Sequence, residues 1–336
     1  MRLRLLPAIG VCALLSGCGS TPTTPGAGSG GGTTPLTLAV TCPAAVTTST
    51  AAASVGVSYA PPAATGGTQP VTASCSPASG SAFNRGTNTV TCSATDAVGK
   101  VATCTFAITV QSIPVLKGTK FLAFGDSITA GEVLNAIRQP IVNAAKSYPT
   151  LLEAQLNSRY IAQVTFVQNY GASGEILMSD QGYRSNETAA RYNLALTAQR
   201  PDAVLLLEGA NDFNSVGITD DQIAEVLRQM VREAFLGNAK AVYLATLTPQ
   251  IPGLLRSSQA ARVPTLNAKI RVIAQQEGAT LVDIYAAMIG NVTTLINADD
   301  GLHPYPAGYA VMADTFNTAI KATFEQSTLS TVSKVR

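Results

Sequence analysis

The stretch Phe121-Leu-Ala-Phe-Gly-Asp-Ser-Ile-Thr129 indicates the fold of the larger part of this chain. An apolar run of strand-forming residues ends at Gly125, and Ser127 follows two positions later. Open α/β sheets bind their ligands at the carboxyl ends of buried strands, which is where this pattern would present a side chain. A serine is a poor nucleophile until a base removes its proton. The rest of the chain must therefore supply a base and an oxyanion site for Ser127.

Around this stretch, apolar runs of strand length alternate with segments of helical periodicity. This alternation is typical of a parallel sheet with crossover helices. We predict a domain over residues 118–326 with a flavodoxin-like fold, an α/β/α three-layer sandwich around a five-stranded parallel sheet. The expected strands are 120–124, 163–168, 202–207, 240–246 and 280–284. The expected helices are 148–159, 184–199, 219–236, 259–277 and 306–325.

Three further polar stretches follow strands of the predicted sheet. They are Asn169-Tyr-Gly-Ala-Ser-Gly174, Gly209-Ala-Asn-Asp212 and Asp300-Gly-Leu-His-Pro304. His303 is the only histidine of the chain, so it is the candidate base. An aspartate three residues before it, Asp300, can hydrogen-bond the imidazole and hold one tautomer. Asp299 is the alternative partner, although its spacing is less favourable.

Together the four stretches resemble the SGNH, or GDSL-type, hydrolase family, and the resemblance covers about residues 118–325. It implies that Ser127 is the nucleophile, His303 the base and Asp300 the residue that orients the base. It also implies an oxyanion hole made by the backbone amides of Ser127 and Gly171 and the side-chain amide of Asn211. One minor departure is Ala210, where the family often has Thr. The domain has no nucleotide-binding glycine loop, metal cluster or CxxC motif, so we expect no cofactor and no metal.

Residues 36–111 differ in composition and predict a separate small β domain. Short alternating runs rich in Val, Thr, Ala and Ser recur between turn residues, which favours antiparallel strands in a small sandwich. These runs are 36–40, 54–59, 71–75, 89–93 and 105–110. Four cysteines in this region allow three disulfide connectivities. A Cys75–Cys92 bond would clamp two neighbouring strands and leave Cys42–Cys104 to join the first strand to the last.

The segment from Val90 to Val110 resembles the end of the hyalin-repeat family of immunoglobulin-like extracellular modules. The likeness covers most of residues 41–110, with Lys100 standing where the family usually has Asn. It implies a module that binds surface carbohydrate or protein. A spacer that presents the next domain is an equally good interpretation, because clustered aromatic side chains are lacking.

The first 35 residues predict export and anchoring. Residues 1–17 have a basic start and a short apolar run, as in a signal peptide, and the run is too short to cross a bilayer. Leu15-Ser-Gly-Cys18 resembles the lipobox of bacterial lipoproteins, which implies cleavage before Cys18 and acylation of that cysteine. Residues 18–35 are a Gly/Thr/Pro-rich flexible tether. We therefore expect an exported lipoprotein, anchored by Cys18 at the outer membrane or cell surface. Residues 327–336 are expected to form a C-terminal tail.

Composition and motifs together give the functional hypothesis. The net charge is +2 with 12% charged residues, so nothing favours nucleic acid as a partner. We expect a serine hydrolase that cleaves carboxylic esters of carbohydrates or lipids through an acyl-enzyme. The alternatives are an acyltransferase or lysophospholipase with the same triad, and a non-catalytic surface adhesin.

Overall fold

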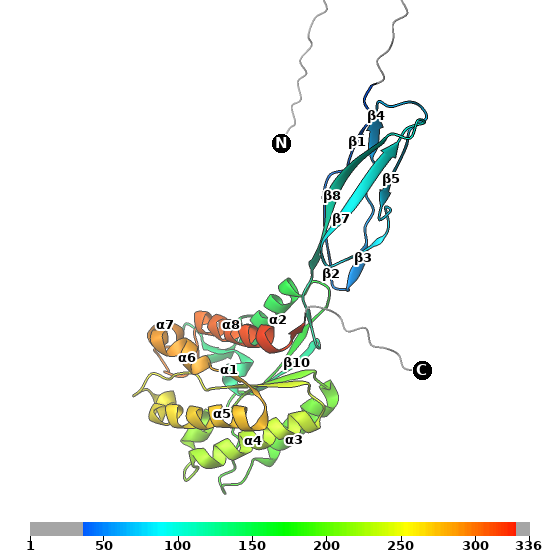
Figure 1. Cartoon of the computed structure of the whole chain (residues 1–336). Helices are drawn as coiled ribbons and strands as arrows, with labels where there is room; N and C mark the ends of the chain where they lie inside the picture. The colour runs from blue at the N-terminus through cyan, green and yellow to red at the C-terminus, as the bar shows by residue number, and fades with distance from the viewer. Residues whose placement is uncertain (1–35, 327–336) are drawn as a thin grey trace, which may run out of the picture.

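The structure is a computed structural model that describes residues 36–326. The predicted signal peptide, Cys18, the tether and the C-terminal tail lie outside the described residues. Figure 1 shows two bodies, an elongated β domain and a larger α/β domain. None of the described helices combines the length and the apolar character that crossing a bilayer requires.

The β domain is built around a sheet in the order β2-β8-β7-β5, flanked by the pairs β1–β4 and β3–β6. Its strands are β1 (Ala39–Thr41), β2 (Val46–Thr50), β3 (Ser54–Gly56), β4 (Ala63–Thr65), β5 (Thr72–Ser76), β6 (Ala82–Asn84), β7 (Gly86–Thr95) and β8 (Val101–Ser112). All five predicted strands have a counterpart, but β2, β4 and β6 were not predicted. The expectation of wholly antiparallel pairing was wrong for β2, which runs parallel to β8.

Two disulfide bonds cross this small domain, between Cys42 and Cys104 and between Cys75 and Cys92. These are the pairs favoured from the sequence. Cys75 and Cys92 are direct cross-strand partners on β5 and β7. Cys42, just after β1, is joined to β8. The bonds lie against a small apolar cluster that includes Val90, Phe106 and Ile108. Such covalent links compensate for the limited core of a domain this size.

The α/β domain confirms the predicted fold class. Its sheet is five-stranded and wholly parallel, in the order β13-β10-β14-β15-β16. The strands are β10 (Lys120–Gly125), β13 (Phe166–Gly171), β14 (Ala203–Leu207), β15 (Ala241–Ala245) and β16 (Thr280–Val282). In chain order this is 2-1-3-4-5, the flavodoxin-like arrangement. The central strands β10 and β14 are almost wholly buried, as expected of strands covered on both faces.

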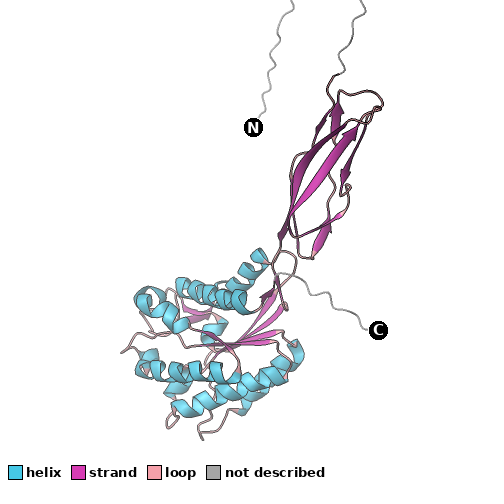
Figure 2. Cartoon of the chain, in the orientation of Figure 1, coloured by secondary structure: helices cyan, strands magenta, loops and turns pink. Residues whose placement is uncertain are grey.

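Helices cover both faces of this sheet, as Figure 2 shows. They are α1 (Ser127–Ala130), α2 (Tyr148–Arg159), α3 (Asn186–Gln199), α4 (Asp220–Leu236), α5 (Val263–Glu277), α6 (Ile284–Met288), α7 (Val292–Leu295) and α8 (Pro306–Thr323). Helix α4 begins with the capping box of Thr219 and Gln222. Helix α8 buries Tyr309, Met312 and Phe316, the apolar face expected from its periodicity.

Several short elements were not predicted. Strands β11 (Glu132–Leu134) and β12 (Pro140–Val142) form a hairpin after α1. Strands β9 (Val115–Leu116) and β17 (Glu325–Gln326) pair where the chain enters and leaves the α/β domain. Short 3-10 helices are η1 (Ala144–Lys146), η2 (Asn211–Asn214), η3 (Leu255–Ser257), η4 (Ala260–Arg262) and η5 (Ile289–Asn291).

Candidate active site

The local backbone after β10 explains how Ser127 is presented. Asp126 is the N-cap of α1, and its carboxylate accepts a 2.8 Å hydrogen bond from the Ile128 amide. The helix is only one turn long, because Gly131 ends it in the left-handed conformation with φ 89°. Ser127 therefore occupies the first position of a short helix at the carboxyl end of a central strand.

The structure brings Ser127, His303 and Asp300 together, although Ser127 and His303 are 176 residues apart. Ser127 Oγ lies 2.9 Å from His303 Nε2, and His303 Nδ1 lies 2.6 Å from Asp300 Oδ2. Ionised Asp300 can only accept, so Nδ1 carries the proton and Nε2 is left to accept from Ser127. All three residues are buried, and His303 is fully inaccessible. This is the hydrogen-bonded chain that general-base activation of a serine requires.

Asp300 is held by its own turn as well as by the histidine. Its second oxygen, Oδ1, accepts from the backbone amides of Leu302 and His303 at 3.0 and 3.1 Å. Burial acts to raise the pKa of Asp300, but the hydrogen bonds from His303 and Leu302 outweigh it and lower the pKa below its ordinary value. The alternative partner, Asp299, instead pairs with Arg138 at 3.0 Å.

Gly171 lies at the carboxyl end of β13, but its backbone amide already has a hydrogen-bond partner. Strand β13 runs three residues further than predicted, so Gly171 is its last residue and pairs with Gly125. The Gly171 amide donates to Asn169 Oδ1 at 2.9 Å. A Cβ at Gly171 would lie 2.1 Å from the amide nitrogen of Ala130, so this glycine permits close packing against α1. The expectation that its amide serves an oxyanion is therefore at odds with the geometry.

Gly174, the next glycine of the same loop, has the opposite environment. It adopts φ 77°, a Cβ added there would meet nothing within 4 Å, and among the described residues no acceptor takes its amide. Asn211 approaches this loop, because its side-chain amide donates to the carbonyl of Glu175 at 2.9 Å. Asp212 holds the loop further on by accepting from the amides of Leu177 and Met178.

Three charged residues near the site were not anticipated. Glu132 Oε1 lies 3.4 Å from His303 Nε2, and Arg256 donates to the same carboxylate oxygen at 3.2 Å. Arg191 donates to the carbonyls of Tyr170 and Gly125 and stacks over Phe124, so it braces the ends of β13 and β10. No local motif marks these residues, since tertiary contacts alone bring them to the site.

The buried carboxyl groups of Asp126, Glu208 and Asp212 lie close enough to affect one another's pKa. Burial, opposed by the hydrogen bond from Ile128 and by the charge of His303, raises the pKa of Asp126 to about 6. Burial and the neighbouring Asp126 and Asp212 raise the pKa of Glu208 well above its usual range. Glu208 Oε1 has no hydrogen-bond partner among the described residues. Protonation of Glu208 removes the free-energy cost of burying a charged carboxylate.

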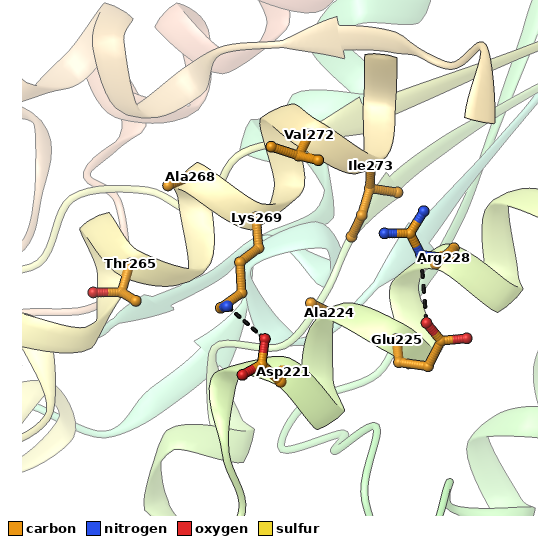
Figure 3. A pocket seen from close by; sticks show the side chains of 9 residues that line it. All are labelled: Asp221, Ala224, Glu225, Arg228, Thr265, Ala268, Lys269, Val272 and Ile273. Carbon is orange, nitrogen blue, oxygen red and sulfur yellow. Dashed lines mark hydrogen bonds and ion pairs between the residues drawn. The ribbon is translucent and has the colours of Figure 1, made fainter. Parts of the chain in front are cut away.

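A groove of about 610 Å³ between α4 and α5 lies outside the candidate site. Figure 3 shows its charged side chains pairing with each other, Lys269 with Asp221 and Arg228 with Glu225. None of the nine residues that line it is a predicted catalytic or oxyanion residue.

Comparison with known proteins agrees with this architecture. Residues 123–311, more than half of the chain, match the model of the GDSL-like lipase/acylhydrolase family. The chain belongs to this family. Residues 33–110 match the HYR domain, so the resemblance of the β domain to hyalin repeats is also confirmed.

The individual proteins that this chain resembles share less than a third of their aligned residues with it. An acetylxylan esterase from Xylanibacter ruminicola is 28% identical over 235 residues, which cover 63% of this chain but only 45% of that protein. A lipase/acylhydrolase from Enterococcus faecalis is similar in structure, with a TM-score of 0.51 and 23% identity, over 63% of this chain and 99% of its own. LAE5, an α/β hydrolase from the metagenome of Lake Arreo, has 26% identity and a TM-score of 0.49, over 61% of this chain and 96% of its own. The bacterial lipase/acylhydrolase supports the fold.

Proposed function

We propose that this member of the GDSL-like family hydrolyses carboxylic esters through an acyl-enzyme on Ser127. The observation that carries the proposal is the continuous chain Ser127–His303–Asp300, with contacts of 2.9 and 2.6 Å. His303 Nε2 takes the Ser127 proton as Oγ attacks the acyl carbon. The same nitrogen then returns the proton to the departing alcohol oxygen as the carbon–oxygen bond breaks. Water attacks the acyl-enzyme by the reverse sequence of proton transfers and releases the acid.

The oxyanion hole in this proposal uses the backbone amide of Ser127, the side-chain amide of Asn211 and the backbone amide of Gly174 in place of Gly171. What favours Gly174 is that its amide is free among the described residues, whereas the Gly171 amide already bonds Asn169. The Asn211 side-chain amide has two N–H groups and uses one of them on the Glu175 carbonyl, which leaves the other for the oxyanion. Such free N–H groups can meet the charge that develops on the acyl oxygen in the transition state.

Acetylated carbohydrate is the substrate class we propose within this chemistry. The relative from Xylanibacter ruminicola, an acetylxylan esterase by name, supports it. The identity is 28% and the match spans 45% of that protein, so the substrate is our proposal for this chain.

The experiment that tests the reaction uses Ser127→Ala and His303→Ala, with p-nitrophenyl acetate as substrate. We expect each variant to lose roughly 10³-fold or more in kcat, with unchanged circular dichroism. Either variant retaining wild-type kcat would overturn the proposal. Arg232→Ala is the control, because Arg232 pairs with Glu277 on an exposed surface outside the site.

We also propose that the protein is exported and acylated at Cys18. The two disulfides of the β domain support the first part, because disulfides persist in oxidising compartments. Mass spectrometry of the mature amino terminus tests the second part, with an acylated Cys18 as the expected result. An unmodified amino terminus upstream of Cys18 would contradict it.

A further inference from the structure

Glu132 and Arg256 form an ion pair that lies against the candidate base yet has no place in the triad. Glu132 Oε1 is 3.4 Å from His303 Nε2 and 3.2 Å from Arg256 Nη1. We propose that this pair binds hydroxyl groups on the alcohol part of the ester, so that the enzyme selects esters of polyols such as sugars. The inference rests on the proposed function, because it assigns the leaving-group side of the same site.

The position of the pair follows from the direction of proton transfer. His303 Nε2 must return its proton to the alkoxy oxygen as the acyl–oxygen bond breaks, so that oxygen has to come within hydrogen-bond reach of Nε2. A group 3.4 Å from the same nitrogen is therefore close to the place that the alkoxy oxygen must occupy.

The fold holds Glu132 firmly in this position. It is the first residue of β11, directly after Gly131 ends the helix that carries Ser127. Its carbonyl accepts a 2.7 Å hydrogen bond from the buried hydroxyl of Tyr309 on α8. The backbone of Glu132 is thus held by its direct connection to α1 and by the hydrogen bond from α8.

Arg256 comes from a different part of the chain, in η3 after β15. Its loop is tied to the turn that carries the Asp300–His303 pair, because the Ile251 amide donates to the Gly301 carbonyl at 2.9 Å. Ser257 Oγ donates to the Ile251 carbonyl and closes the loop on itself. The backbone that carries Arg256 is therefore tied to the turn that carries His303.

Burial and charge indicate what the pair can bind. The Glu132 side chain is 6% exposed and that of Arg256 is 41% exposed, so the carboxylate lies deep and the guanidinium extends toward solvent. Among the described residues, Glu132 is the only partner of the Arg256 side chain. A carboxylate that accepts, next to a guanidinium with free donors, complements hydroxyl groups, which both donate and accept. A hydrocarbon in the same place would take these charges out of water without replacing their hydrogen bonds.

Two acetate esters that differ by one hydroxyl test the inference. They are trans-2-hydroxycyclohexyl acetate and cyclohexyl acetate, and the measured quantity is the ratio of their kcat/KM values. We expect the wild type to prefer the hydroxylated ester. Arg256→Ala and Glu132→Gln should each lower the ratio roughly 10-fold or more, the effect of a lost hydrogen bond to a charged group. Arg232→Ala, which removes a surface ion pair, should leave the ratio at the wild-type value.

Other outcomes separate this inference from the function on which it rests. If both variants lose activity equally on the two esters, the pair acts on His303 or on the fold, and the proposed subsite is overturned. If both variants keep wild-type activity and the wild-type ratio, the proposed subsite is overturned as well. If the wild type hydrolyses neither ester nor p-nitrophenyl acetate, the proposed function fails and the inference fails with it.

Discussion

At the scale of single residues, Asp300 sets the tautomer of His303 and is itself held by the turn that carries both residues. Asp300→Asn keeps the size of the side chain but can present an N–H to Nδ1, which favours the wrong tautomer. We expect kcat to fall roughly 10²–10⁴-fold at neutral pH with little change in KM. Steady-state kinetics on p-nitrophenyl acetate measure this, with Asp299→Asn as the matched control because Asp299 pairs with Arg138. Equal activity of the two variants would contradict the role of Asp300.

We expect Asp126 to make the free energy of unfolding depend on pH. Its pKa of about 6 in the folded protein lies above the ordinary 3.8, mainly because of burial. The folded state therefore holds a proton that the unfolded state has lost between these values, and stability falls as the pH rises through this window. Asp126→Asn keeps an oxygen for the Ile128 amide but has no charge.

We therefore expect the melting temperature of Asp126→Asn, relative to wild type, to increase by several degrees between pH 4 and pH 8. Calorimetry at both pH values measures this difference. Parallel pH curves for the two proteins would show that Asp126 does not carry the effect.

At the scale of elements, the contact between β13 and α1 depends on Gly171. A Cβ there would lie 2.1 Å from the Ala130 nitrogen, so Gly171→Ala should force the strand and the helix apart. We expect a loss of about 1–3 kcal/mol or more in the free energy of unfolding, as for other overpacked sites. Gly174→Ala is the control, since open space surrounds it and only its positive φ adds a cost of about 1 kcal/mol. Denaturant titration measures both, and a greater loss for Gly174→Ala would contradict this account.

The helices and strands also show which parts of the fold and of the site could be predicted from the sequence. Ser127, Asp300 and His303 could be identified because each stands in a short stretch whose local spacing carries chemical meaning. The strand predicted at 163–168 occupies 166–171. Gly171 was assigned to the oxyanion hole through the family resemblance, and the sequence did not show that its amide bonds Asn169. Strand ends are poorly specified locally, since pairing with β10 decides where β13 stops. Glu132 and Arg256 are 124 residues apart and meet only in the folded chain.

At the scale of the whole molecule, the two domains differ in their dependence on cysteines. The bonds close segments with sequence separations of 62 and 17 and contribute about 4 and 3 kcal/mol to the β domain by loop entropy. No cysteine follows Cys104, so the α/β domain depends on none. Reduction with a phosphine should therefore lower the melting temperature of the β domain and leave kcat on p-nitrophenyl acetate unchanged. Loss of activity in step with reduction would show that the candidate active site depends on the β domain.

The proposed reaction of the whole molecule depends on Ser127 as the nucleophile, activated by His303. Its most direct test is the mass of the peptide that contains Ser127 after treatment with a fluorophosphonate. We expect one adduct on Ser127 in the wild type, and none after denaturation or in His303→Ala. An adduct on another serine, or equal labelling of Ser127 without His303, would contradict it.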